Sequence, residues 1–141
     1  MSEKLCALKK RGGGGALTET TLWTNSSPTS NMADGTLLTL SQPYSDFDYI
    51  KVEYNYSVNE QISYTVIFTK ELFDSAFNGG AYGGRPYLGI YTGAAQIVRI
   101  FYGATNNPNP SQLYTTGGRR VKSTSGDLNT HVIPTKIIGL K

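Results

Sequence analysis

A regular alternation of side chains between Phe47 and Thr69 constrains the fold more than any other feature of the sequence. Between Asp48 and Tyr56 apolar or aromatic residues recur at every second position, and the pattern returns between Gln61 and Thr69. Side chains on an extended chain switch faces at each residue, so this period indicates strands with one face toward water. Only residues 57–60 separate the two runs, which is enough for an antiparallel hairpin but too little for a crossover helix. The predicted inner face consists of Ile50, Val52, Tyr54, Tyr56, Ile62, Tyr64, Val66 and Phe68, and Lys51 is expected on the wet face.

Further β-prone segments, separated by turn residues, lie on both sides of this hairpin. We expect strands in residues 16–24, 35–40, 87–91, 96–102 and 129–139. The segment 96–102 is apolar apart from Arg99, which indicates burial on both faces. Pro134 limits the last strand to an edge or a bulge, and Lys70–Phe77 has the composition of one or two helical turns. About seven or eight short strands predict an all-β domain, a β-sandwich or a jelly roll, over residues 16–141.

Residues 1–15 differ in composition from the rest of the 141-residue chain. Residues 1–11 carry four cations and one anion, a net charge of +3, whereas residues 12–141 carry nine of each sign. Four consecutive glycines follow, where the backbone is most free. We interpret this stretch as an anchoring arm and a hinge, with phosphate contact or a solubilising tail as the alternatives. The anchoring residues would be Lys4, Leu5, Leu8, Lys9, Lys10 and Arg11, and the hinge would be Gly12, Gly13, Gly14 and Gly15.

The sequence gives little indication of catalytic chemistry. The single cysteine, Cys6, excludes an internal disulfide and a multi-cysteine metal site, which is typical of synthesis in a reducing cytoplasm. The single histidine, His131, has no second metal ligand nearby in sequence, and no nucleophile elbow occurs. A weak glycan hydrolase would need two carboxylates facing each other across a groove. We expect no enzyme activity, catalytic residue, metal or cofactor, no membrane partner, and no nucleic-acid partner.

The ten tyrosines are the most unusual feature of the composition. Those within the hairpin are explained by packing, whereas others lie in or beside loops rich in glycine, asparagine and proline. A tyrosine ring offers a flat apolar face and a polar tip, which serves subunit interfaces and sugar stacking alike. We favour an interface and keep a glycan-contacting rim as the alternative. The contacts in either case would be Tyr82, Arg85, Tyr87, Tyr91, Asn107 and Tyr114.

Two parts of the sequence resemble a group of small structural proteins of tailed bacteriophages. The opening motif LWTN-x-x-PTS covers residues 22–30 and is followed by the segments Thr36–Leu40 and Phe47–Ile50. The chain closes on an Ile-x-Gly-x-Lys pattern at residues 137–141. The resemblance covers under a third of the chain and implies a virion fibre, tail-tip or capsid-surface domain. Such domains are usually all-β and often homotrimeric, and the group carries no catalytic residues to transfer.

On this resemblance, the chain is expected to be a head fibre, a decoration protein or a short tail fibre. It would be made in the host cytoplasm and then lie on the virion surface. Residues 1–15 would bind a capsid or tail protein of the same particle, and the β domain would form a homo-oligomer, with a trimer favoured. A carbohydrate-binding module that contacts a host surface glycan is the alternative.

Overall fold

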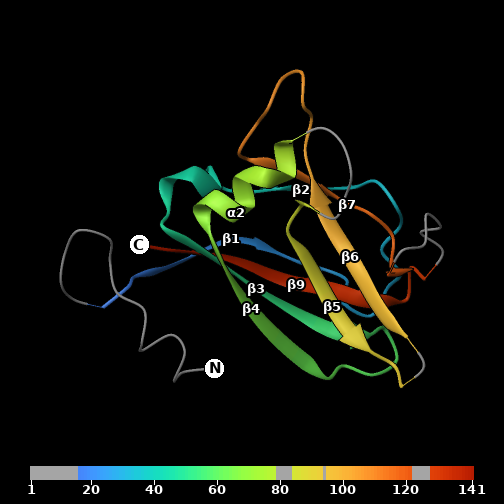
Figure 1. Cartoon of the computed structure of the whole chain (residues 1–141). Helices are drawn as coiled ribbons and strands as arrows, with labels where there is room; N and C mark the ends of the chain where they lie inside the picture. The colour runs from blue at the N-terminus through green and yellow to red at the C-terminus, as the bar shows by residue number, and fades with distance from the viewer. Residues whose placement is uncertain (1–15, 79–83, 94, 122–127) are drawn as a thin grey trace.

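The computed structural model describes residues 16–78, 84–93, 95–121 and 128–141. The expected arm and hinge in residues 1–15, as well as Tyr82, lie outside these ranges. Within them the chain forms a sandwich-like arrangement of two antiparallel sheets (Figure 1), which confirms the predicted all-β class. The strands are β1 (Glu19–Thr24), β2 (Thr36–Thr39), β3 (Tyr49–Ser57), β4 (Ser63–Thr69), β5 (Tyr87–Tyr91), β6 (Gln96–Tyr102), β7 (Gln112–Thr115), β8 (Arg119–Arg120) and β9 (His131–Leu140).

The first sheet has the strand order β1-β9-β3-β4 and contains the predicted hairpin. β3 and β4 pair antiparallel, with Val52 opposite Val66. The Ser57 N–H donates to the Glu60 carbonyl, and the Ser57 hydroxyl accepts from the Glu60 N–H at 2.9 Å, so one serine closes the turn. Buried on the inner face of the hairpin are Ile50, Val52, Tyr54 and Phe68, and Tyr56, Tyr64 and Val66 pack against the core partly buried. The prediction is wrong for Ile62, which precedes β4 and is 53% exposed.

The position of Lys51 differs from the expectation that it faces water. Lys51 is only 5% exposed, and its Nζ atom lies 3.1 Å from Oε1 of Glu19. β9 lies between β1 and β3, so Lys51 sits toward the middle of the sheet rather than at its rim. The aliphatic stem is covered while the ammonium group reaches a carboxylate on β1, as long basic side chains commonly do.

β9 is an internal strand, so the alternative of an edge position for the proline-containing strand is wrong and the alternative of a bulge holds. Glu53 is opposite Lys136 and Tyr54 is opposite Pro134, which leaves Thr135 as an extra residue in β9. The Thr135 hydroxyl donates to the Glu53 carbonyl at 3.0 Å. The bulge interrupts the ladder beside Pro134, where a backbone N–H donor is missing.

The second sheet has the order β2-β7-β6-β5, and β8 also pairs with β6. The sequence did not indicate β7, and the glycines at 117 and 118 suggest a basic turn where the structure forms the short strand β8. β7 and β8 follow each other along the same side of β6, with Thr116–Gly118 between them. In this gap the Thr116 N–H donates to the Ile100 carbonyl and the Thr116 hydroxyl accepts from the Ile100 N–H. One threonine therefore completes the hydrogen bonds that the broken strand omits.

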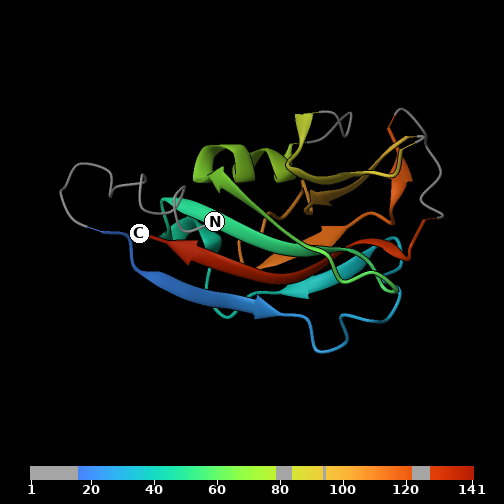
Figure 2. The same ribbon diagram turned by 90° about the horizontal axis from the view of Figure 1, so that it is seen from below.

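The two sheets enclose the core, and a short helical segment closes one end. β5 and β6 pass in front of the first sheet in Figure 1, and Figure 2 shows the two layers from below. The predicted helical turns are confirmed as α2 (Lys70–Asp74) and the 3-10 turn η2 (Ser75–Phe77). The Phe73 ring lies 5.6 Å from the ring of Phe68 in the first sheet and 5.5 Å from that of Phe101 in the second. Phe73 therefore joins both layers.

Arg99 points into the core from the middle of β6, and residues 97–101 are all buried as predicted. Its guanidinium is fully buried and donates to carbonyl groups from three separate segments. The acceptors are Met32 (3.0 Å), Thr116 (2.6 Å), Asn129 (3.4 Å), His131 (3.1 Å) and Val132 (2.6 Å). Burial lowers the pKa of Arg99 to about 10, against a weaker opposing effect of Asp34, so the group is still charged at neutral pH.

Candidate functional site

The outward side of the second sheet gathers apolar and aromatic side chains. Alternate residues of a strand point to opposite faces. The core side is marked by Leu38, Leu88, Ile90, Ile97, Phe101 and Leu113. Their neighbours in sequence point outward and align across the strands, as Tyr91 does with Gln96 and Tyr102 does with Tyr114. We call this surface the tyrosine face; its members are Leu37, Tyr87, Tyr91, Val98, Ile100, Tyr102, Tyr114 and Val121.

Exposure singles out this face. In the part of the chain that the structure describes, six large hydrophobic residues are exposed: Leu37, Ile62, Leu72, Tyr87, Tyr91 and Val121. Four of the six belong to the tyrosine face, and Tyr87 and Tyr91 are 48% and 75% exposed. The four come from both sides of the sheet, Leu37 from β2 and Tyr87 and Tyr91 from β5, whereas Val98 and Ile100 on β6 are only 7% exposed. Exposed apolar side chains that share one face make it a candidate interaction surface.

The charged groups beside the tyrosine face are already engaged within the chain. The Arg85 guanidinium donates from Nε and Nη2 to the Asn78 carbonyl and lies 5.9 Å from the centre of the Tyr102 ring. Nη2 of Arg119 lies 3.5 Å from Oδ1 of Asp34. The Tyr102 and Tyr114 rings stack at 5.5 Å between centres. The surface is therefore apolar and aromatic, and the guanidinium groups of Arg85 and Arg119 beside it are held by contacts within the chain.

Of the residues singled out from the sequence, the structure brings four together. Tyr87, Tyr91 and Tyr114 are members of the tyrosine face, and Arg85 adjoins it through Tyr102. Asn107 is exposed in the loop between β6 and β7 and is not part of the face. Tyr82, the arm residues Lys4, Leu5, Leu8, Lys9, Lys10 and Arg11, and the hinge residues Gly12–Gly15 lie outside the described residues.

Sequence reasoning missed five members of the face: Leu37, Val98, Ile100, Tyr102 and Val121. Tyr102 carried a usable signal, because a strand that buries Ile97, Arg99 and Phe101 must turn Tyr102 outward. Val121 lies beyond the end of β8, and only its hydrogen bond to the Gln96 carbonyl places it in the same row.

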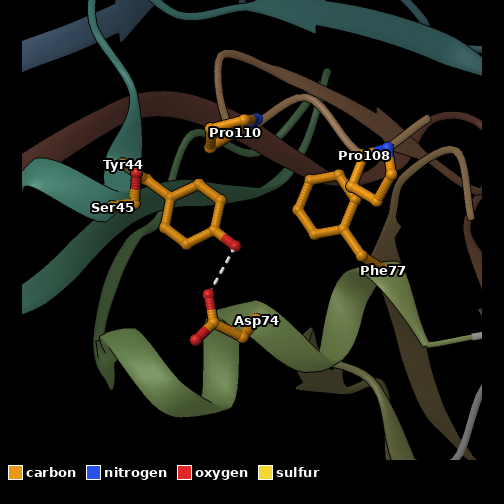
Figure 3. A pocket seen from close by; sticks show the side chains of 6 residues that line it. All are labelled: Tyr44, Ser45, Asp74, Phe77, Pro108 and Pro110. Carbon is orange, nitrogen blue, oxygen red and sulfur yellow. Dashed lines mark hydrogen bonds between the residues drawn. The ribbon is translucent and has the colours of Figure 1, made fainter.

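A second candidate site is a pocket of about 330 Å³ at the end of the sandwich that carries α2 (Figure 3). Three segments far apart in the sequence line it with Tyr44, Ser45, Asp74, Phe77, Pro108 and Pro110. The Tyr44 and Phe77 rings lie side by side, 6.0 Å apart at 11° between planes. The Tyr44 hydroxyl donates to Oδ1 of Asp74 at 2.7 Å, and Lys70 donates to Oδ2 at 3.0 Å. Burial, reinforced by this carboxylate, raises the pKa of Tyr44.

The pocket offers one carboxylate, because Asp74 is the sole acid among its six lining residues.

His131 is not near this pocket. It is half-buried on β9, with Nδ1 3.0 Å from the Thr130 hydroxyl and its ring in an edge-on contact with the Tyr56 ring. Within the described residues no three histidine, cysteine, aspartate or glutamate side chains gather in a way that could hold a metal ion. None of the helices in those residues is both long and apolar enough to cross a membrane.

In comparisons with known proteins, no protein-family model and no curated protein matches this chain. The resemblance to tailed-phage proteins therefore depends on the motifs in residues 21–50 and 133–141 alone.

Proposed function

We propose that this protein is a non-catalytic structural subunit of a tailed-phage particle, and that it forms a homo-oligomer through the tyrosine face. The observation that supports the oligomer is the gathering of four of the six exposed large hydrophobic residues on one sheet face. Cores of protein interfaces are enriched in tyrosine and arginine and depleted of unpaired charge. The motif resemblance supports the particle, and it favours a trimer on the virion surface.

The tyrosine face fits a second copy of the chain better than a sugar. A sugar site needs polar groups that converge on the ligand, in addition to an aromatic wall. Here Arg85 and Arg119 already contact Asn78 and Asp34. Arg119 is paired with the Asp34 carboxylate, and Arg85 is held by the Asn78 carbonyl beside the Tyr102 ring. Because both guanidinium groups already have contacts within the chain, the exposed aromatic side chains can form the contact between copies in a closed symmetric oligomer.

Light scattering on the full chain tests the oligomer. A trimer has a mass of about 46 kDa, three times the 15.3 kDa of one chain. The double substitution Tyr87→Ser and Tyr91→Ser should shift the mass to that of the monomer, because hot-spot aromatic residues carry most of an interface's binding energy. The matched control is Ile62→Ser with Leu72→Ser, which removes the two exposed apolar side chains outside the face. A monomeric wild type, or a double variant of unchanged mass, would contradict the proposal.

Attachment to the particle is a separate step, which we assign to the arm in residues 1–11 and the glycine hinge. Its net charge of +3 and its leucines fit a docking segment that binds a capsid or tail protein. A chain lacking residues 1–11 should retain its oligomeric mass and lose co-sedimentation with particles that lack the protein. Equal co-sedimentation of the truncated and full chains would refute the anchor while leaving the oligomer standing.

A further inference from the structure

The pocket beside α2 combines an apolar floor with a polar rim. Phe77, Pro108 and Pro110 supply the apolar part. Phe77 is fixed in place because it packs against Gly103, where an added Cβ would come within 2.2 Å of the ring. Tyr44 is only 3% exposed and its hydroxyl already donates to Asp74, so it offers a ligand little surface. A ligand would therefore rest on the phenylalanine and the two proline rings.

The rim carries donors and acceptors side by side. The lining residue Asp74 forms an ion pair at 3.0 Å with Lys70, which is not itself a lining residue, and the two side chains are 45% and 33% exposed. Each carboxylate oxygen has an acceptor site beyond the bond that it already makes, and the Lys70 ammonium has further donors. The exposed residue Ser45 adds a hydroxyl on the opposite wall. Because the two charges are already paired, a charged ligand gains little here, whereas a neutral ligand that both donates and accepts can bind to both groups.

We infer that this pocket binds one neutral pyranose unit of a glycan, with the apolar face of the sugar on Phe77, Pro108 and Pro110 and neighbouring hydroxyls on Asp74 and Lys70. Vicinal sugar hydroxyls donate and accept at once, which matches an adjacent carboxylate and ammonium. The volume of about 330 Å³ lies at the small end of the roughly 300–1,000 Å³ range of ligand pockets, so it accommodates a single ring.

The site binds the sugar without hydrolysing it. Cleavage of a glycosidic bond uses two carboxyl groups on either side of that bond, and the lining residues supply Asp74 alone. This inference stands on residues of the pocket and does not require the oligomer. On a particle that displays several copies, such weak single sites would act together through multivalency.

Amide chemical-shift titration tests the inference with glucose, galactose, mannose and N-acetylglucosamine, each added to about 50 mM because a shallow single-sugar site binds on the order of 1 mM. At least one sugar should shift the backbone amides of Ser45, Asp74 and Phe77. The substitution Asp74→Ala should weaken that binding at least tenfold. Lys70→Ala removes the same ion pair by deleting the partner that lies farther from the pocket. It replaces Asp74→Ala as the test if that variant does not fold.

Ile62→Ser, which lies outside both the pocket and the tyrosine face, is the matched control and should leave sugar binding unchanged. The absence of shifts at the pocket for all four sugars would overturn the inference, as would equal binding by wild type and the ion-pair variants. Light scattering on the same samples reports the oligomer independently, so failure of the sugar site and failure of the proposed assembly give different results.

Discussion

The substitution Arg99→Met removes the cation at the centre of the fold while keeping a flexible side chain of similar length. Four carbonyl groups lose their guanidinium donor, namely those of Met32, Thr116, His131 and Val132. The Asn129 carbonyl keeps the N–H of Met32 at 3.1 Å and is less affected. At about 1.5 kcal/mol for each hydrogen bond to a charged group, the gross loss is about 6 kcal/mol.

Relief of the buried charge offsets part of this loss. Burial lowers the pKa of Arg99 from 12.5 to about 10, and each pKa unit corresponds to about 1.4 kcal/mol, so the desolvation that Arg99→Met removes is about 3.5 kcal/mol. The expected net decrease in the free energy of unfolding is therefore about 2.5 kcal/mol, toward the upper end of what single substitutions usually cost.

Urea unfolding followed by the fluorescence of Trp23 measures this decrease. With a slope of about 2 kcal/mol per molar urea, the midpoint should fall by about 1.2 M. Arg120→Met is the matched control, because Arg120 is the exposed arginine of neighbouring β8, and its effect should stay within about 0.5 kcal/mol. Arg99→Lys should also destabilise the fold, because an ammonium lacks the planar fork that reaches three segments. Equal midpoints for Arg99→Met and Arg120→Met would refute the reasoning.

Two further changes have expected outcomes. Burial raises the pKa values of Tyr44 and Tyr54 above 10, so the stability that they contribute is complete below pH 10 and is lost as the pH rises beyond it. When urea midpoints are measured from pH 8 upward, the decline for Tyr44→Phe should be less steep than that for the wild type. Arg99 titrates in both proteins alike, so parallel curves would contradict the assignment to Tyr44. Gly139→Ala places a Cβ 2.4 Å from the Phe47 ring and should lower the free energy of unfolding by about 1–3 kcal/mol. Thermal unfolding followed by circular dichroism measures this loss. A thermal midpoint within 1 °C of that of the wild type would contradict it and show that the Phe47 ring can move aside.

The hairpin was predictable because its two strands have one core face and one polar face, so the period of two survives in the sequence. The burial of Lys51 was not, since it depends on β9, which comes from the other end of the chain and lies beside β3. Likewise, the role of Arg99 depends on Met32, 67 residues away in sequence. The two-residue strand β8 is too short to show a period, and it forms because β6 offers an edge.

The candidate sites, too, were predictable only in part: some of their residues could be found from the sequence, but their arrangement in space could not. Tyr87, Tyr91 and Tyr114 were found from their sequence neighbours, because a tyrosine beside glycine or proline has little core to enter. The sequence did not show that they share one sheet face, which follows from the pairing of β5, β6 and β7. The pocket was missed because Ser45, Asp74 and Pro108 belong to segments that only the fold brings together.

The two sheets differ in the charge on their outer faces, and this difference gives the proposed oligomer a direction. On the first sheet, Glu53 of β3 stands opposite the exposed Lys136 of β9, and the ammonium group of the buried Lys51 reaches Glu19, whose side chain is 40% exposed. Opposite charges across strands stabilise a face that stays in water, and burying them would carry a desolvation cost. The tyrosine face has apolar side chains in the corresponding positions, so its burial costs less and releases more apolar surface from water. In the proposed assembly the second sheet therefore lies inward at the subunit contacts, and the charged sheet forms the outside of the particle appendage.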